Sequence, residues 1–239
     1  MKRLKELLSS SPKYKLLDIG TGYGNFIQLL LDVSKKYGEI IGIDTSEKAI
    51  EVASNNFKDH KKIKFVRMDA NSLQYPDAYF DFVSLSNSLH HLDNIKSTLS
   101  EMERVLKPSG MILINEMVAD ELSPAQKSHK LLHHLSAEID REQGMTHNDT
   151  FAKSEIAQVL LDNSTCEIAT SWVLDFERDL TCTKEDVEEL IKILERIVSR
   201  IKDADRVEYY LKKAEDIKKH FHKYGYAPTP QLLYVLKKS

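Results

Sequence analysis

The sequence predicts an α/β protein with a doubly wound, mostly parallel sheet of seven strands and two helical insertions. Three observations predict it. Short β-branched runs alternate with helical patterns through the first half, as in βαβ units. The runs are nearly continuously apolar, as expected of strands buried on both faces. A glycine-rich turn directly follows the first run, where such folds bind their ligands.

The first half is expected to supply five parallel strands, at residues 14–19, 39–44, 63–68, 80–86 and 111–116. Helices of about 10 to 15 residues separate them, as βαβ crossovers require. Ser46 is a candidate N-cap for the second of these helices. We expect Pro108-Ser109-Gly110 to stop the helix that ends in RVLK, residues 104–107, before the fifth strand begins.

The second half contains two insertions. Residues 118–150 are rich in histidine and acidic residues at helical spacing, and they interrupt the alternation right after the fifth strand, as a lid would. A helix at 154–161 and an alternating strand at 167–176 restore it. The second insertion spans 177–228, and a last strand follows at 231–238. The whole chain is therefore predicted to be one domain, residues 1–239, that carries both insertions.

The second insertion is expected to contain two amphipathic helices. In the first of them, apolar residues recur every three or four positions from Val187 to Ile201, which predicts a single apolar seam. Thr183 and Asp186 resemble a capping pair at its start, and Gly225 ends the second helix. A coiled-coil dimer would also use such a seam, but about two heptads are short for one. Packing against the following helix is therefore favoured.

Composition excludes several classes of protein. The 34 Lys and Arg against 37 Asp and Glu give a net charge of −3, which supplies no positive field for a phosphate backbone. No apolar run approaches the roughly 20 residues that span a bilayer, and the first residues lack the apolar core of a signal peptide. Two cysteines, Cys166 and Cys182, are too few for a disulfide framework. We expect a cytoplasmic protein with neither nucleic acid nor membrane as its partner.

The glycine-rich turn is DIGTGYGNF, residues 18–26. Glycines at alternate positions let the backbone turn tightly and let a ligand approach bare N–H groups at a helix N-terminus. A dinucleotide fingerprint would place its third glycine at position 25, where this chain has Asn25. The turn predicts a nucleotide-like ligand, although a plain strand-to-helix turn can have the same pattern.

Acidic residues strengthen the first interpretation. Asp18 and Asp44 stand at the ends of the first and second predicted strands, and Asp69 ends the third in the same way. Because the carboxyl ends of parallel strands share one edge, the three carboxylates are expected to converge on one crevice, with Asp44 placed to accept ribose hydroxyls. Each alone is more often a helix N-cap. Three at corresponding positions make that reading inadequate.

Together with these residues, the segments GIDTS, RMDANSL, FDFVSLSNSLHHL and EMERVLKPSGMILINE resemble the class I S-adenosylmethionine-dependent methyltransferases, which have a Rossmann-like fold. Within them the chain is similar to the small-molecule group that includes the quinone-biosynthesis enzymes. The resemblance covers residues 14–116 closely and says little about the substrate. One departure is Ser109-Gly110, where the group usually has two glycines.

The resemblance implies S-adenosyl-L-methionine as cofactor and S-adenosyl-L-homocysteine as product. The implied cofactor-binding residues are Asp18, Gly20, Gly22, Tyr23, Gly24, Asp44, Thr45, Asp69, Ala70 and Asn87. Asp18 would hold the amino group, Asp44 the ribose hydroxyls and Asp69 the adenine edge, together with the Ala70 backbone. Thr45 would flank the adenine, and Asn87 would face the methionine moiety through its backbone.

Histidines are the candidate catalytic residues. His90 and His91 follow the fourth strand, and an imidazole with a pKa near 6.5 suits proton removal at neutral pH. A pocket-lining role is the favoured alternative, and His91 is the better candidate for a base. His133 in the first insertion is a further candidate.

The first insertion also offers two pairs of possible metal ligands one helical turn apart, His129 with His133 and His134 with Glu138. Solvated histidines on a lid helix are favoured over a metal, so no metal is predicted.

We therefore expect a methyltransferase, monomeric or homodimeric, that acts on an O, N or C atom of a small-molecule acceptor. Two alternatives are a protein or nucleic-acid methyltransferase and a non-catalytic S-adenosylmethionine-binding regulator. Base-modifying amino methyltransferases typically have Pro-Pro and an aromatic residue after strand four. Here Ser88, Leu89 and His90 follow Asn87, which counts against a base substrate.

Overall fold

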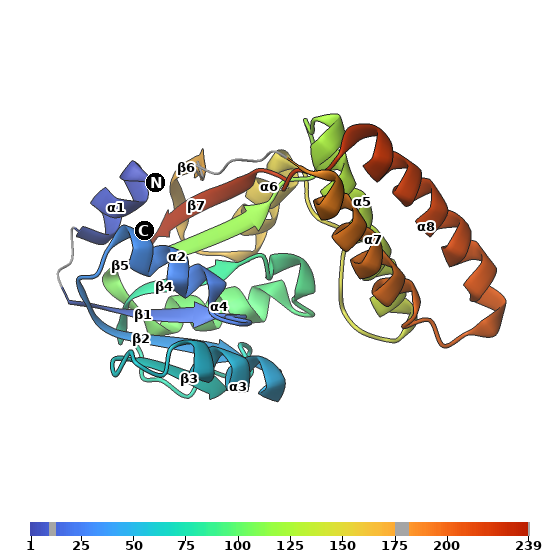
Figure 1. Cartoon of the computed structure of the whole chain (residues 1–239). Coiled ribbons are helices and arrows are strands. Elements are labelled where there is room, and N and C mark those ends of the chain that lie inside the picture. Colours follow the sequence, from blue (N-terminus) through green and yellow to red (C-terminus); the bar gives the residue numbers. More distant parts are fainter. Residues whose placement is uncertain (10–12, 175–181, 239) are drawn as a thin grey trace. The chain divides into compact units, whose positions relative to one another are not determined.

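The computed structural model describes residues 1–9, 13–174 and 182–238 (Figure 1). The chain divides into two compact units. Unit 1 comprises Met1–Glu116, Glu155–Phe176 and Gln231–Ser239, and unit 2 comprises Met117–Ser154 and Glu177–Pro230. The first predicted insertion, 118–150, falls in unit 2, and so do the described residues 182–228 of the second. Residues 177–181 of the second insertion lie outside the described residues.

Unit 1 is built on a seven-stranded sheet in the order β3-β2-β1-β4-β5-β7-β6. Its strands are β1 (Tyr14–Ile19), β2 (Tyr37–Asp44), β3 (Ile63–Arg67), β4 (Phe80–Ser86), β5 (Leu106–Met117), β6 (Glu167–Val173) and β7 (Gln231–Lys237). β1 to β5 pair in parallel, and β6 pairs antiparallel with β7. Figure 1 shows β7 running against β5. The predicted mostly parallel, seven-stranded sheet is therefore confirmed.

The helices of this unit each bury apolar side chains. They are α1 (Lys2–Ser9), α2 (Asn25–Val33), α3 (Glu47–Asn56), the 3-10 turn η1 (Leu89–His91), α4 (Ile95–Val105) and α6 (Lys153–Asn163). A buried cluster joins Leu4 of α1 and Leu30 of α2 to Leu16 of β1, with Trp172 of β6 packed against it. Ser46 caps α3 as predicted, since its hydroxyl accepts a hydrogen bond from the Ala49 N–H at 3.2 Å.

Several boundaries differ from the sequence prediction: β2 begins at Tyr37 instead of 39, and β5 begins at Leu106 instead of 111. α4 ends at Val105 instead of running through Lys107, because Leu106 already pairs with Phe80 as the first residue of β5. β3 ends at Arg67, two residues before Asp69. β6 ends at Val173, and positions 175 and 176 of its predicted range lie outside the described residues.

Unit 2 has a helical core of its own. It contains α5 (Pro124–Glu142), α7 (Lys184–Val198) and α8 (Ala204–Tyr224). The α7 seam packs within the unit: Leu194 and Val187 lie in one buried cluster with Leu135 of α5 and Phe221 of α8. The predicted capping pair of α7 is confirmed, because the Thr183 hydroxyl and the Asp186 carboxylate form a capping box.

None of the helices in residues 1–9, 13–174 and 182–238 combines the length and apolar character needed to cross a membrane.

Candidate functional site

The turn after β1 depends on three glycines in the left-handed region. Gly20, Gly22 and Gly24 have φ of 61°, 52° and 85°, which costs a glycine nothing and strains other residues. The Thr21 N–H donates to the Ile43 carbonyl at 2.9 Å and ties the turn to β2. Gly24 caps α2 without a side-chain hydrogen bond, so the first N–H groups of α2 are not taken up by a capping side chain.

The three glycines have different neighbours. A Cβ atom at Gly20 would lie 2.5 Å from the Ser88 hydroxyl, and one at Gly24 would lie 2.5 Å from the Phe57 ring. Apart from Gly22 itself and its two chain neighbours, no heavy atom of the described residues lies within 4 Å of a Cβ built at Gly22. Gly20 and Gly24 therefore serve packing, whereas Gly22 borders open space that a ligand can fill.

The three acidic residues form a staircase along the sheet edge. Asp18 pairs in register with Gly42, so Asp44 lies two residues further along β2, and Asp44 pairs with Arg67, so Asp69 lies two residues further again. Each step is about 7 Å at a rise of about 3.3 Å per residue. The sequence predicted that the three share one edge of the sheet, and the strand register adds that each lies further along its strand than the one before. They therefore line an extended path, from a buried side chain at Asp18 to an exposed one at Asp69.

Asp18 is the buried end of this staircase. Its Oδ1 atom accepts a hydrogen bond from the Ser84 hydroxyl on β4 at 2.7 Å. Its Oδ2 atom is buried and accepts none from the described residues within 3.5 Å. Burial raises the pKa of Asp18 to about 6, and the charge of Asp44 adds to the rise. A cationic group delivered to Oδ2 would favour the ionised form and lower this pKa.

Asp44 and Asp69 each hold a backbone turn. Asp44 accepts hydrogen bonds from the N–H groups of Gly22 and Ser46, both at 2.9 Å, and so holds the backbone of the glycine turn. Asp69 accepts the Asn71 N–H at 2.8 Å. Asp44 is not an N-cap, because Ser46 fills that role for α3. Each carboxylate oxygen can accept a further hydrogen bond.

Asn87 follows β4 at the same edge, in a strained conformation. Its φ of 49° lies in the left-handed region, and its N–H donates to the Asn115 carbonyl at 2.8 Å. The Asn87 Oδ1 atom is buried and has no hydrogen-bond partner among the described residues. Backbone strain next to an unsatisfied buried acceptor is typical of a ligand site.

The other implied cofactor residues lie in the turns of this edge. Tyr23 is 50% exposed, and its carbonyl accepts a hydrogen bond from the Asn56 side chain. The Thr45 carbonyl accepts one from Arg67 at 3.0 Å. Ala70 is half-buried in the turn after β3.

His90 and His91 occupy η1, and their environments differ. His90 is buried, and its Nδ1 atom lies 3.0 Å from Oε1 of Glu116 at the end of β5. The Leu89 N–H donates to the other oxygen of the same carboxylate at 3.0 Å. His91 is exposed. Sequence reasoning missed Glu116, although a carboxylate that ends the apolar run MILINE indicates a buried partner.

The histidines of unit 2 have separate partners. His129 accepts a hydrogen bond from the Thr229 N–H at 3.0 Å, and burial lowers its pKa. His134 lies 2.8 Å from the Thr150 hydroxyl, and Glu138 binds Lys213 at 2.5 Å. His133 instead lies beside His147, 14 positions along the chain. In the described contacts of this unit, the histidine that His133 meets is therefore His147, on the loop after α5.

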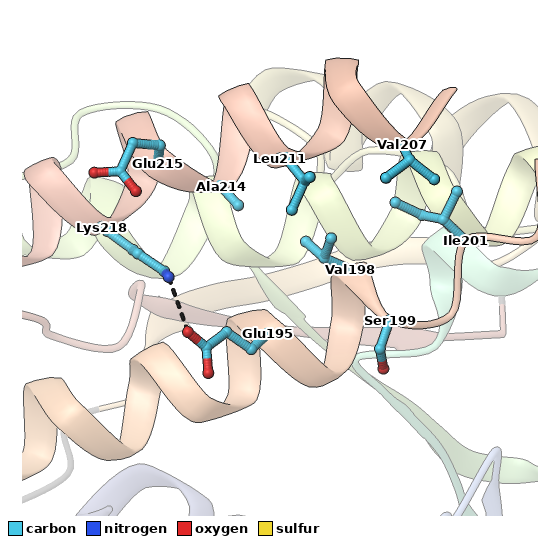
Figure 2. A pocket seen from close by; sticks show the side chains of 9 residues that line it. All are labelled: Glu195, Val198, Ser199, Ile201, Val207, Leu211, Ala214, Glu215 and Lys218. Carbon is cyan, nitrogen blue, oxygen red and sulfur yellow. Dashed lines mark hydrogen bonds and ion pairs between the residues drawn. The ribbon is translucent and has the colours of Figure 1, made fainter. Parts of the chain in front are cut away.

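Unit 2 also has a groove of about 500 Å³ between α7 and α8 (Figure 2). Val198, Val207 and Leu211 supply apolar side chains, and the ion pair of Lys218 with Glu195 at 2.9 Å lies at one end. The groove follows the seam between two helices and contains none of the predicted site residues.

Comparison with known proteins identifies the part of the chain that carries this site. Residues 17–114 match the model of a methyltransferase domain. Demethylmenaquinone methyltransferase of Staphylococcus saprophyticus is 35% identical over 115 residues, which are 48% of this chain and 49% of the relative. The demethylmenaquinone methyltransferase of Bacillus licheniformis is 30% identical over 106 residues, 44% of this chain and 46% of that one. The chain thus spans about half the length of the curated relatives it matches.

Solved structures support the fold over a longer range. A Bacillus halodurans protein named as a candidate methyltransferase superposes with a TM-score of 0.64 over 100% of both chains, at 17% identity. A SAM-dependent methyltransferase from Aquifex aeolicus covers 72% of this chain and 82% of its own length, with a TM-score of 0.52 and 19% identity. At these identities the likeness concerns the fold alone.

Proposed function

We propose that this chain, which resembles the class I S-adenosylmethionine-dependent methyltransferases, transfers a methyl group from S-adenosylmethionine to a small-molecule acceptor. One observation carries the proposal. The glycine turn leaves open space at Gly22, directly beside the carboxylate of Asp44 that holds the Gly22 N–H. An extended nucleoside ligand fits this edge, where open-sheet α/β proteins bind their ligands.

The unsatisfied groups match the chemistry of the cofactor. The Asp18 Oδ2 and Asn87 Oδ1 atoms are buried acceptors, and the amino acid end of S-adenosylmethionine carries an ammonium group. Asp44 retains acceptor capacity for the two ribose hydroxyls. Asp69 and Ala70 lie at the exposed end of the staircase, where an adenine edge would be held. The residues therefore fit this cofactor from one end to the other.

The bound cofactor supplies an electrophilic methyl group on a positively charged sulfur. The chain's own residues need chiefly to align the acceptor with the sulfur–methyl bond, because alignment alone lowers such a barrier substantially. The nucleophilic atom gains the methyl group and loses its proton. When bound, the cofactor would supply this methyl group and would keep the electrons of the sulfur–methyl bond, so that S-adenosylhomocysteine would be the product.

His91 is the residue of unit 1 that we assign to accepting the acceptor's proton. It is exposed directly after β4, whereas His90 is buried with Nδ1 directed at Glu116. We assign His90 to positioning η1. In the alternative, both histidines only line the pocket. Replacing His91 by Ala distinguishes the two roles: loss of a general base lowers kcat about 100- to 10,000-fold, whereas loss of a lining residue raises KM.

The names of the relatives suggest which acceptor to test first. Demethylmenaquinone is a quinone, and its reduced ring offers a carbon nucleophile. The matched residues cover less than half of this chain, so other small phenols and amines belong in the same screen. The measurement is formation of S-adenosylhomocysteine with each acceptor.

Titration calorimetry tests the proposal before any acceptor is known. We expect the intact chain to bind S-adenosylmethionine and S-adenosylhomocysteine. It should not bind NAD, because Asn25 replaces the third glycine of the dinucleotide fingerprint. Binding of NAD with no binding of either sulfur nucleoside would overturn it.

The lid role of residues 118–150 stays a prediction. Hydrogen exchange of the intact chain checks it: S-adenosylhomocysteine together with an acceptor should slow exchange within 118–150. Unchanged exchange there would refute a lid.

A further inference from the structure

The loop that follows α5 folds back and brings His147 against His133. The two Nε2 atoms lie 3.4 Å apart, and the imidazole planes are nearly perpendicular, at 84°. From this arrangement we infer that unit 2 holds a divalent first-row transition metal, of the zinc type, on His133 and His147. The inference uses residues of unit 2 alone and does not rest on the proposed methyl transfer.

The distance between the nitrogen atoms fits shared coordination of one metal ion. An N–H···O hydrogen bond is ordinarily about 2.7 to 3.2 Å long between the heavy atoms. Two imidazole nitrogens at about 2.05 Å from a tetrahedral zinc ion lie about 3.3 Å from each other. The observed 3.4 Å is close to this edge of a tetrahedron and longer than an ordinary N–H···O hydrogen bond.

Asp140 orients one of the two imidazoles for this role. Its Oδ2 atom lies 2.8 Å from Nδ1 of His147, so Nδ1 carries the proton and Nε2 has a lone pair directed at His133. A carboxylate behind a ligating histidine is the usual outer partner of metal-bound imidazole, because it fixes the tautomer and raises basicity. Arg200 in turn donates to the other Asp140 oxygen at 2.8 Å.

The loop is held in this conformation by several contacts. Arg141 donates to the His147 carbonyl at 2.6 Å and to the Asp149 carboxylate at 3.0 Å. The Thr150 hydroxyl lies 2.8 Å from Nε2 of His134 on α5. His147 is therefore positioned before any ion arrives, which reduces the entropy lost when the site forms.

Imidazole ligands suit zinc, copper, nickel and iron, whereas magnesium and calcium take oxygen ligands. Two protein nitrogens leave at least two positions of a tetrahedral ion to other donors. Water, other side chains or an oxygen atom of an acceptor can fill them.

The test is equilibrium dialysis of the intact chain against Zn²⁺ near pH 7.5, where imidazoles are neutral. We expect wild type to bind one ion per chain. His133→Ala and His147→Ala should abolish that binding. Asp140→Asn should weaken it about 10- to 100-fold, the usual effect of an outer partner. His222→Ala, an exposed histidine on α8, is the matched control and should bind like wild type.

Two results would overturn the inference. One is wild-type binding that is no tighter than binding by the double variant lacking both His133 and His147. The other comes from X-ray absorption of the zinc-loaded wild type, which counts imidazole ligands without any substitution. Fewer than two imidazoles on zinc would refute the site, even if the variants fail to fold.

Discussion

His90 Nδ1 lies 3.0 Å from Glu116 Oε1, and neither side chain is exposed to solvent. The second oxygen of Glu116 accepts the Leu89 N–H at 3.0 Å. One carboxylate at the end of β5 thereby fixes the backbone turn that follows β4. That turn carries His91, so the position of the proposed base depends on a residue 25 positions further along the sequence.

Glu116→Ala is expected to destabilise the chain by about 2 to 6 kcal/mol, because two buried N–H groups lose an acceptor at about 1 to 3 kcal/mol each. Glu116→Gln keeps one acceptor oxygen and should cost less. Urea unfolding of both variants provides the measurement. Glu51→Ala, on the exposed face of α3, is the control and should stay within about 0.5 kcal/mol of wild type. An equally small effect of Glu116→Ala would show that this contact does not hold the turn.

Gly22→Ala should separate backbone strain from cofactor binding. Gly144 in unit 2 provides the matched control, because its φ is 78° and a Cβ there also meets nothing within 4 Å among the described residues. Both alanine variants should lose about 1 to 2 kcal/mol of stability from left-handed strain. Only Gly22→Ala should weaken binding of S-adenosylhomocysteine, by about tenfold or more, since its methyl group enters the proposed cofactor space. Calorimetry showing equal affinity in both variants would remove Gly22 from the cofactor site.

Asp44→Ala should weaken the binding of S-adenosylhomocysteine by about 1 to 3 kcal/mol, the usual effect of losing hydrogen bonds to a charged acceptor. Asp44→Asn retains one acceptor oxygen and should lose less. Asp32→Ala on α2 removes a carboxylate that contacts only the exposed Gln28 side chain in the described structure, and serves as control. Calorimetric affinities in the order wild type, Asn, Ala support the ribose role. An unchanged affinity in Asp44→Ala contradicts it.

Local patterns sufficed for much of the fold. The strands at 14–19 and 80–86 are predicted to the residue, because buried parallel strands have apolar runs that end at polar residues. The caps at Ser46 and Thr183 are equally local, since each side chain reaches an N–H three residues ahead.

Features that depend on distant partners were not predictable in the same way. The staircase of Asp18, Asp44 and Asp69 arises from strand register, which single strands do not specify. His147 meets His133 because the loop after α5 folds back, whereas helical spacing pointed to His129. Asn87 was expected at the cofactor, but its unsatisfied Oδ1 atom is visible only once the surrounding residues are placed.

Asp18 predicts how stability depends on pH. Its pKa is about 6 in the folded chain, against 3.8 for a free aspartate side chain. Between these values the folded state binds more protons than the unfolded state, so stability falls as pH rises from about 4 to about 6. A difference of about two pKa units corresponds to about 3 kcal/mol. Asp18→Asn cannot ionise, so its stability relative to wild type should increase by about this amount between pH 4 and pH 7. If the free energies of unfolding of the two proteins change in parallel with pH across this range, the raised pKa of Asp18 is contradicted.

The same carboxyl predicts the pH dependence of cofactor binding, with the opposite sign. The ammonium group of S-adenosylhomocysteine favours ionised Asp18. Below the pKa of about 6 that Asp18 has in the folded chain without ligand, Asp18 must therefore release its proton when the ligand binds. The affinity should therefore fall about tenfold for each pH unit below about 6 and level off above it. Calorimetry in buffers of different ionisation enthalpy measures both the affinity and the proton released. Asp18→Asn should bind more weakly at neutral pH and lose this slope, because the amide has no proton to release. A wild-type affinity that stays constant from about pH 5 to about pH 8 would place the ammonium group elsewhere.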